Sequence, residues 1–259
     1  MRIGFTSFAF RWAVASGRMN TELFLIRSLE LGAGTVQICE NIEYLKLSSD
    51  ERRQLYERFG ERLNIEVGAR GFRMEDFMPA LSAAADFGSD YLRIVVENGN
   101  FAVDAKTAIN TIETMVPYLE KAQIKLGLEN HFNFTPHQIA EIMQRINHPL
   151  IGVCFDPFNS ISHLVGVNEA FTTLQPYINS LHLKDATIRR KNTGFYISGC
   201  SLGEGVVPAK ELLQKLSLYK QIESVHLESW MDALETENET FAAENLLNSE
   251  GIKYLRSLL

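Results

Sequence analysis

The amino-acid sequence predicts an α/β fold, a single (β/α)8 barrel of the TIM type that spans residues 1–259 as one domain. Short runs rich in Ile, Val and Phe alternate with segments of helical periodicity, a pattern typical of parallel βαβ units. Eight such runs are present, which favours a closed barrel over an open sheet. The length of 259 residues also suits one barrel of roughly 250 residues.

The predicted strands are short apolar runs at fairly regular intervals. The longest interval separates the seventh strand from the eighth. In order along the chain the strands are residues 2–6, 35–39, 64–69, 91–96, 125–129, 151–156, 180–184 and 224–228.

The predicted helices lie between these strands and carry start and stop signals. Asn20 opens the first long one, and Gly32 follows it as a C-terminal stop. Ser48 is the expected cap of the next, and Thr135 with Pro136 begins another. Residues 104–122 form one apolar stripe with Pro117 inside it, so we expect a kink or a break there, and residues 241–259 form the eighth helix.

Residues 186–207, between the last two strands, are predicted to form a long loop. They show little periodicity and include Gly194, Gly199, Gly203 and Gly205. Loops longer than about 12–15 residues in a compact domain are usually functional. This one would lie at the C-terminal rim of the barrel, where barrel active sites are built.

The composition narrows the class of protein. The chain is 46% hydrophobic without a run of about eighteen apolar residues, so a membrane-spanning protein is not expected. The net charge is −7, and because binding to a phosphate backbone needs a positive face, a nucleic-acid partner is not expected either. Cys39 and Cys154 lie within apolar runs, and the N-terminus shows no export signal, so we expect a cytoplasmic protein.

Four residues of metal-ligand type stand at the ends of the fifth to eighth predicted strands: Glu129, Asp156, His182 and Glu228. Any one of them alone would be explained as a helix cap or a loop residue. On consecutive strands of a barrel, however, the four can converge at one point, where three carboxylates without a counter-ion would repel one another. The set therefore predicts one divalent metal ion. Mn²⁺ is the first choice, and Mg²⁺, Co²⁺ and Zn²⁺ also suit oxygen ligands with one imidazole.

Neighbours of these four residues can share the site, because side chains two positions apart on a strand point to the same face. We expect His131 and Lys184 to contact the substrate. His226 would lie one layer deeper as a hydrogen-bonded core histidine, and Asp185 would cap or brace the neighbouring loop. The aromatic residues that follow strand ends could wall the pocket or belong to the core: Phe8, Trp12, Phe72 and Trp230.

The sequence around these residues resembles the xylose-isomerase-like family of (β/α)8 barrels, in the segments LGLENHFNFTP, GVCFDPFNS, SLHLKDA, GCSLGEGVVP and HLESW. That family includes sugar isomerases, ketose 3-epimerases, hydroxypyruvate isomerase, inosose dehydratase and the endonuclease-four group of DNA repair enzymes. The resemblance covers nearly the whole chain and implies a metal site made by Glu129, Asp156, His182 and Glu228. It also implies that the turn with Glu204 lies near the substrate, although an exposed turn acid explains Glu204 equally well.

This chain departs from the family pattern in two ways. The repair endonucleases assemble three zinc ions with additional histidines, and no histidine follows the second or third strand here, so a trinuclear centre is not expected. Asn159 stands where several ketose epimerases use a histidine to hold the substrate. Asn159 is therefore a candidate substrate-binding residue, and the sugar specificity of those epimerases is in doubt.

The first functional hypothesis is a metal-dependent isomerase or epimerase of a small ketose, sugar phosphate or related keto-acid. The ion would polarise an α-hydroxyketone, and the resulting enediolate would be stabilised where its charge develops. The resemblance implies that Glu129 and Glu228 exchange protons with the substrate carbon from opposite sides. Two bases on opposite faces invert a stereocentre, whereas one base that moves a proton between neighbouring carbons interconverts an aldose and a ketose.

Two alternatives stay open. The same enediolate could expel a hydroxyl group or arise by loss of CO₂, so the second hypothesis is a dehydratase or decarboxylase acting on a keto-sugar or keto-acid. The third is a non-catalytic sugar-binding barrel, which the presence of all four ligands disfavours. A homo-oligomer is compatible with the sequence, although no feature identifies an interface.

Overall fold

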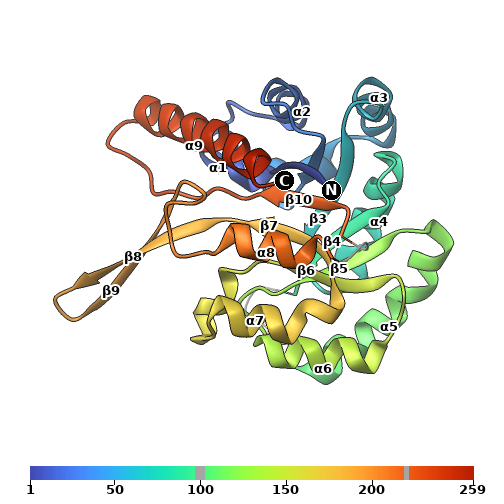
Figure 1. The fold of residues 1–259 in the computed structure, drawn as a ribbon. Helices are drawn as coiled ribbons and strands as arrows, with labels where there is room; N and C mark the ends of the chain where they lie inside the picture. The colour runs from blue at the N-terminus through green and yellow to red at the C-terminus, as the bar shows by residue number, and fades with distance from the viewer. Residues whose placement is uncertain (97–102, 219–221) are drawn as a thin grey trace.

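Eight parallel strands close into a barrel in the computed structural model, which describes residues 1–96, 103–218 and 222–259 (Figure 1). The predicted fold class is confirmed, and each strand matches its prediction to within two residues at either end. The strands are β1 (Arg2–Thr6), β2 (Thr35–Ile38), β3 (Asn64–Arg70), β4 (Tyr91–Val95), β5 (Lys125–Glu129), β6 (Ile151–Phe155), β7 (Ile178–Leu183) and β10 (Ser224–Leu227).

The strands follow one another around the barrel in chain order, and β10 pairs with β1 to close it. Most of their residues are buried, because helices cover the outer face and side chains fill the interior. This burial on both faces explains why the strands are continuous apolar runs in the sequence. It also makes the few polar residues inside them unusual.

The helices pack around the barrel, and their start signals work as the sequence predicts. The Asn20 side chain accepts a hydrogen bond from the backbone of Leu23, and Ser48 and Thr135 each form a capping box. The helices are α1 (Arg11–Ala15), α2 (Thr21–Glu30), α3 (Ser49–Phe59), α4 (Met74–Asp86), α5 (Ala105–Ala122), α6 (Pro136–Ile146), α7 (Val167–Leu174), α8 (Ala209–Leu216) and α9 (Glu237–Ser257).

Two helix predictions need correction. Pro117 does not break α5, which continues to Ala122. Pro117 is exposed to solvent, so water can satisfy the carbonyl that loses its partner, while the opposite face of the helix stays packed. The last helix begins at Glu237 rather than at residue 241, because Thr236 caps it by accepting a hydrogen bond from the backbone of Glu239.

The predicted loop at residues 186–207 is mostly an antiparallel hairpin of β8 (Asp185–Lys191) and β9 (Gly194–Cys200). Lys191 pairs with Gly194, which leaves a two-residue turn. The hairpin extends away from the barrel (Figure 1). Both faces of its outer part are exposed, so no hydrophobic alternation marked the two strands in the sequence.

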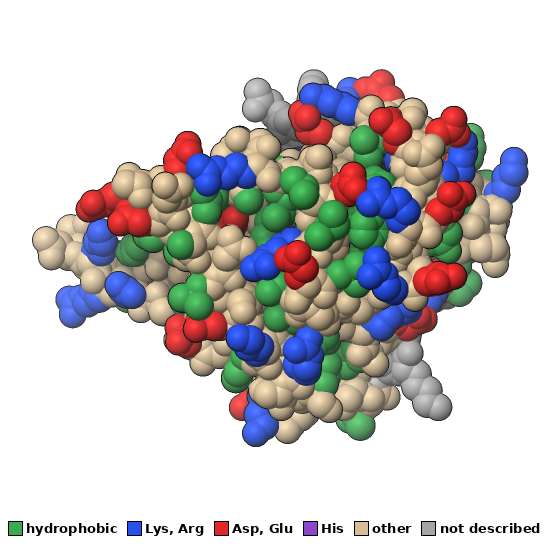
Figure 2. Space-filling model, turned by 90° about the horizontal axis from the view of Figure 1, so that it is seen from above, with side chains coloured by type: hydrophobic (Ala, Val, Ile, Leu, Met, Phe, Trp, Pro, Cys, Tyr) green, Lys and Arg blue, Asp and Glu red, His purple; other side chains and the backbone are tan. Residues whose placement is uncertain are grey.

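The surface seen in Figure 2 carries basic and acidic side chains close to one another. Within the described ranges, no helix combines the length and the apolar character needed to cross a bilayer. The two chain ends lie near each other beside β10 and the end of α9 (Figure 1).

Candidate metal centre and active site

The four predicted ligands lie together at the carboxyl ends of β5, β6, β7 and β10, which are neighbours in the barrel. Glu129 ends β5, Asp156 and Glu228 directly follow β6 and β10, and His182 is the penultimate residue of β7. One ligand atom from each residue lies within 4.8 Å of the other three. Glu129, Asp156 and His182 are buried, and the side chain of Glu228 is only 13% exposed.

Three buried atoms of this cluster make no hydrogen bond of standard geometry among the described residues, although two of them lie within ion-pair distance of a basic side chain. His182 Nδ1 is one of them, and it lies 3.3 Å from Glu228 Oε2 and 3.8 Å from Glu129 Oε2. Glu129 Oε2 and Asp156 Oδ2 are the others, and they pair with Arg93 Nε and Lys184 Nζ. A shared divalent cation would give His182 Nδ1 a partner and would draw the same two carboxylate oxygens to one point. Three carboxylates with one imidazole could therefore hold a metal ion such as Mn²⁺, Mg²⁺, Co²⁺ or Zn²⁺.

Lys184 provides a positive charge at the edge of the cluster. Its Nζ lies 2.7 Å from Asp156 Oδ2 and 3.3 Å from Glu228 Oε1. Burial by itself would lower the pKa of Lys184, but Asp156 and Glu228 raise that pKa well above its usual value. Burial would likewise raise the pKa of Glu228, yet Lys184 and His182 hold it well below its usual range. Lys184 is therefore a charged ammonium, and Glu228 is an ionised carboxylate.

A cavity of about 440 Å³ adjoins the cluster, and Lys184 and Glu228 line it. This volume lies in the range of small-molecule sites. A ligand in the cavity would reach both the ammonium of Lys184 and the carboxylate of Glu228. Most of the remaining wall is apolar and is made by Phe8, Phe132, Phe158, Ile161, Ile197 and Trp230.

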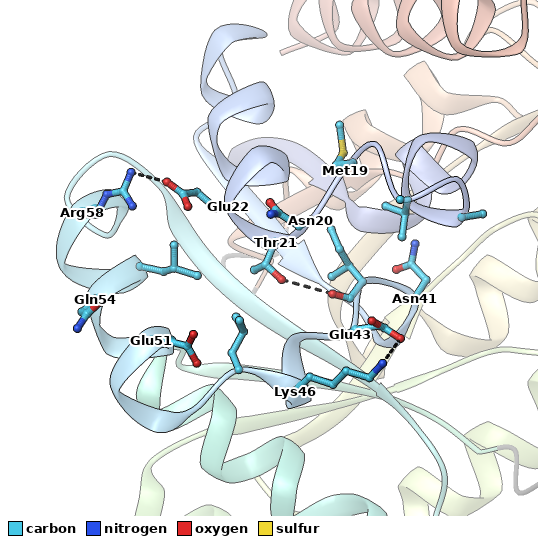
Figure 3. Close-up of a pocket in the computed structure, with 16 residues that line it drawn as sticks. Met19, Asn20, Thr21, Glu22, Asn41, Glu43, Lys46, Glu51, Gln54 and Arg58 are labelled. Carbon is cyan, nitrogen blue, oxygen red and sulfur yellow. Dashed lines mark hydrogen bonds and ion pairs between the residues drawn. The ribbon is translucent and has the colours of Figure 1, made fainter. Parts of the chain in front are cut away.

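A larger cavity of about 720 Å³ lies between the end of α1, the start of α2 and one side of α3 (Figure 3). Both basic side chains of its lining pair with acidic ones: Arg58 Nη2 lies 2.6 Å from Glu22 Oε1, and Lys46 Nζ lies 2.6 Å from Glu43 Oε1. The described residues that line it include none of the four predicted ligands. The converging ligand atoms, rather than the cavity volume, therefore mark the smaller cavity as the candidate active site.

Comparison with known proteins identifies the family. Residues 66–258 match the family model described as xylose isomerase-like TIM barrel. The chain belongs to this family. A curated relative, the 3-oxo-isoapionate decarboxylase of Pectobacterium atrosepticum, is 27% identical over 262 residues, which cover 98% of this chain and 95% of the relative.

Solved structures of other proteins share the fold. A D-psicose 3-epimerase solved in the presence of D-fructose superposes with a TM-score of 0.77 at 14% identity, over 100% of this chain and 99% of that one. A xylose isomerase-like TIM barrel protein from Mycobacterium smegmatis, in complex with magnesium, has a TM-score of 0.71 at 16% identity, over 100% and 97% of the two chains. At these identities the likeness shows the fold alone.

In this xylose isomerase-like barrel, Gln37 of β2 holds the ring of His182. Gln37 Oε1 lies 3.0 Å from His182 Nε2 and also accepts a hydrogen bond from Arg93 Nε at 3.3 Å. Gln37 Nε2 donates to Glu66 Oε2 at 3.3 Å. All four residues are buried.

These contacts fix the tautomer of His182. Arg93 can only donate, so the atom of Gln37 that faces it must be the oxygen. That oxygen also faces His182 Nε2, which must then carry the proton. When the ring is neutral, as binding of a metal ion requires, its lone pair is therefore on Nδ1, the atom that faces Glu129 and Glu228.

Glu129 is held at both carboxylate oxygens. Asn159 Nδ2 donates to its Oε1 at 2.9 Å, and Arg93 Nε lies 3.1 Å from its Oε2. Burial would raise the pKa of Glu129, but Arg93 and His182 outweigh it and lower that pKa. Asn159 therefore positions a predicted ligand, and it also lines the cavity as its predicted substrate role requires.

The other predicted contact residues divide between the cavity and its surroundings. Lys184 lines the cavity, whereas His131 and Glu204 are not among the described residues that do. His131 packs its ring 4.0 Å from the centroid of Phe132, whose side chain forms part of the wall. Glu204 is exposed in its turn.

The aromatic residues that follow strand ends divide between the cavity wall and other positions. Phe8 and Trp230 line the cavity, whereas Phe72 is buried in the core and Trp12 donates from Nε1 to the carbonyl of Met231. His226 is a buried histidine whose Nε2 lies 3.2 Å from Thr35 Oγ1.

The sequence reasoning missed Gln37, Glu66 and Arg93. Each is a polar residue in the interior of a mostly apolar strand, in the runs TVQI, NIEVGAR and YLRIV. A polar side chain in a strand buried on both faces needs a partner in the barrel interior. That signal could have identified all three residues.

Proposed function

We propose that this protein is a divalent-metal-dependent enzyme that acts on a small keto-sugar or keto-sugar acid through an enediolate. Glu129, Asp156, His182 and Glu228 are the proposed ligands. The observation that carries the proposal is the convergence of their four ligand atoms within 4.8 Å beside a cavity of about 440 Å³. A bound ion would supply Lewis-acid polarisation of a carbonyl and stabilise the developing negative charge.

The arrangement of proton-transfer groups favours a lyase over an epimerase. Epimerisation needs one base on each face of the substrate. Glu228 lines the cavity, but Glu129 is not among the described lining residues, and its side chain is 3% exposed between Arg93 and Asn159. The groups that can exchange a proton with a ligand in the cavity therefore lie on the side of Glu228 and Lys184.

We infer that the reaction is the decarboxylation of a β-keto sugar acid. The electrons of the bond to the carboxylate carbon move toward the ketone, CO₂ leaves, and the enediolate carbon then takes up one proton. Lys184 is the proposed donor, because its ammonium lines the cavity, and water then returns the proton to it. The 27% identity to a decarboxylase along almost the whole chain supports this choice over an isomerase or a dehydratase.

The test compares two products of the Mn²⁺-loaded enzyme: CO₂ from 3-oxo sugar acids, and deuterium exchange into D-fructose in D₂O. We expect CO₂ from the acids and no exchange into the ketose. Exchange without CO₂ would instead establish the isomerase or epimerase reaction. Removal of the metal with EDTA should abolish turnover.

Two variants test the proposed roles of Glu228 as a metal ligand and Lys184 as the proton donor. Glu228→Ala should eliminate both turnover and the rise in melting temperature that Mn²⁺ causes in the wild-type protein. Lys184→Met should lower kcat by about 10²–10⁴-fold, the usual contribution of a general acid. A wild-type melting curve that Mn²⁺ leaves unchanged would refute the metal site.

A further inference from the structure

Arg11 places a positive charge in the wall of the candidate active-site cavity and forms no ion pair among the described residues, although the buried Glu244 carboxylate interacts with it electrostatically. Its guanidinium carbon lies 5.3 Å from the centroid of the Trp12 ring. The other charged lining residues, Lys184 and Glu228, pair with each other at 3.3 Å. In the larger cavity of Figure 3, both basic lining residues, Arg58 and Lys46, also have acidic partners, which Arg11 lacks among the described residues.

The backbone that carries Arg11 is firmly held. Arg11 is the first residue of α1, and the buried Glu244 accepts hydrogen bonds from the next two backbone N–H groups, those of Trp12 at 2.7 Å and Ala13 at 3.1 Å. On the other side, Asn248 Nδ2 donates to the carbonyl of Ala9 at 2.6 Å. Two side chains of α9 thus fix the point from which the guanidinium reaches the cavity.

We propose that Arg11 binds an anionic group of the substrate and makes the enzyme selective for acidic over neutral sugars. A guanidinium forms two parallel hydrogen bonds with a carboxylate or a phosphate, and both groups are compatible with this wall. The inference rests on the proposed function, because it takes this cavity to be the substrate site. Loss of CO₂ from a β-keto acid would also remove the anion, so the product would bind Arg11 less tightly than the substrate.

The experiment measures the affinity of three probes for the Mn²⁺-loaded protein by calorimetry: neutral D-fructose, 2-keto-D-gluconate and D-fructose 6-phosphate. The second is not a β-keto acid, so decarboxylation of the proposed kind does not consume it. We expect one anionic probe to bind more tightly than D-fructose by roughly 10- to 100-fold, as one charged hydrogen-bonded contact would give. Arg11→Gln should remove that advantage and leave the affinity for D-fructose unchanged.

Arg18→Gln is the matched control. Arg18 lies just beyond α1, where its Nη2 is 3.5 Å from Glu237 Oε2 and its guanidinium stacks on Phe241, and it is not a lining residue of the cavity. This variant removes the same charge and should keep the preference for the anion. Both side chains are exposed, so both variants should fold, which a melting curve verifies.

If Arg11→Gln weakens the binding of 2-keto-D-gluconate, the anionic group is a carboxylate. If it weakens the binding of D-fructose 6-phosphate, the anionic group is a phosphate. The proposal is wrong if neither anion binds more tightly than D-fructose, or if Arg11→Gln preserves the difference. If Mn²⁺ fails to bind, the proposed function fails separately. The same comparison of Arg11→Gln with the wild type in metal-free protein then decides whether Arg11 binds anions.

Discussion

At the scale of single residues, polar side chains inside the barrel determine how the candidate ligands are presented. The four ligands could be predicted because each stands at a strand end and belongs to a metal-binding residue type. Gln37, Arg93 and Glu66 could have been recognised as buried polar residues, but their role as supports could not, because they come from β2, β4 and β3, far from the ligands in sequence. Only contacts across the barrel reveal that Gln37 fixes the ring of His182.

Replacing Gln37 should weaken metal binding. Gln37→Leu leaves His182 Nε2 without an acceptor, so the ring is no longer held with its Nδ1 lone pair toward the carboxylates. Changes to residues that orient a metal ligand typically cost 10–100-fold in affinity, and we expect an increase of about that size in the Kd for Mn²⁺. Calorimetric titration measures it.

Thr35→Val provides the control for this prediction. It also removes a buried polar group of the barrel interior, but its hydroxyl contacts His226 rather than a predicted ligand. The Kd for Mn²⁺ should stay near the wild-type value. Equal Kd values for Gln37→Leu and the wild type would show that Gln37 has no positioning role.

At the scale of elements, the turn that follows the hairpin is organised by one buried carboxylate. Asp185 accepts hydrogen bonds from the backbone N–H groups of Gly203, Gly205 and Val207 at 3.0, 2.9 and 3.0 Å. The sequence suggested that Asp185 braces a loop, but not that β8 and β9 form a hairpin. Exposed strands lack the apolar alternation from which buried strands are recognised.

Asp185→Asn should destabilise this turn. The amide keeps one acceptor oxygen and turns an NH₂ group toward backbone donors that then lack a partner. We expect the free energy of unfolding to fall by about 2–3 kcal/mol, as for a lost hydrogen bond to a charged group. Urea denaturation measures this loss of stability. The control is Asp232→Asn, because Asp232 is exposed and bonds only to Tyr196 of β9 in the described part of the chain. This variant should change the free energy of unfolding little. Equal losses in the two variants would contradict the bracing role.

At the scale of the whole molecule, closing the barrel buries an ionisable layer beneath the candidate metal centre. Glu66 is 3% exposed there, and His226 Nε2 lies 3.7 Å from its Oε2. Burial raises the pKa of Glu66 from 4.5 to about 7, although hydrogen bonds from Ser224 and Gln37 oppose the rise. Glu66 should therefore contribute a pH-dependent term to the global stability.

The sign of that dependence follows from proton binding. Between the unfolded pKa of 4.5 and the folded value of about 7, the folded protein binds the proton more strongly, so stability falls as the pH rises through this range. Glutamine does not titrate, so the free energy of unfolding of Glu66→Gln should not fall in this way. In excess EDTA, the variant should gain up to about 3 kcal/mol relative to the wild type between pH 4.5 and pH 8. Urea denaturation at both pH values tests this, and a difference in stability that stays constant with pH would refute it.

The sequence by itself determined the barrel and the chemical identity of the candidate ligands. Apolar runs, helix caps and strand ends are local patterns, and the strands and most helix starts follow from them because backbone geometry and burial act over a few residues. The tertiary structure decided which polar side chains meet inside the barrel. The distances from Gln37 to His182 and from Asn159 to Glu129 depend on how the strands are staggered as the barrel closes, which no local pattern specifies.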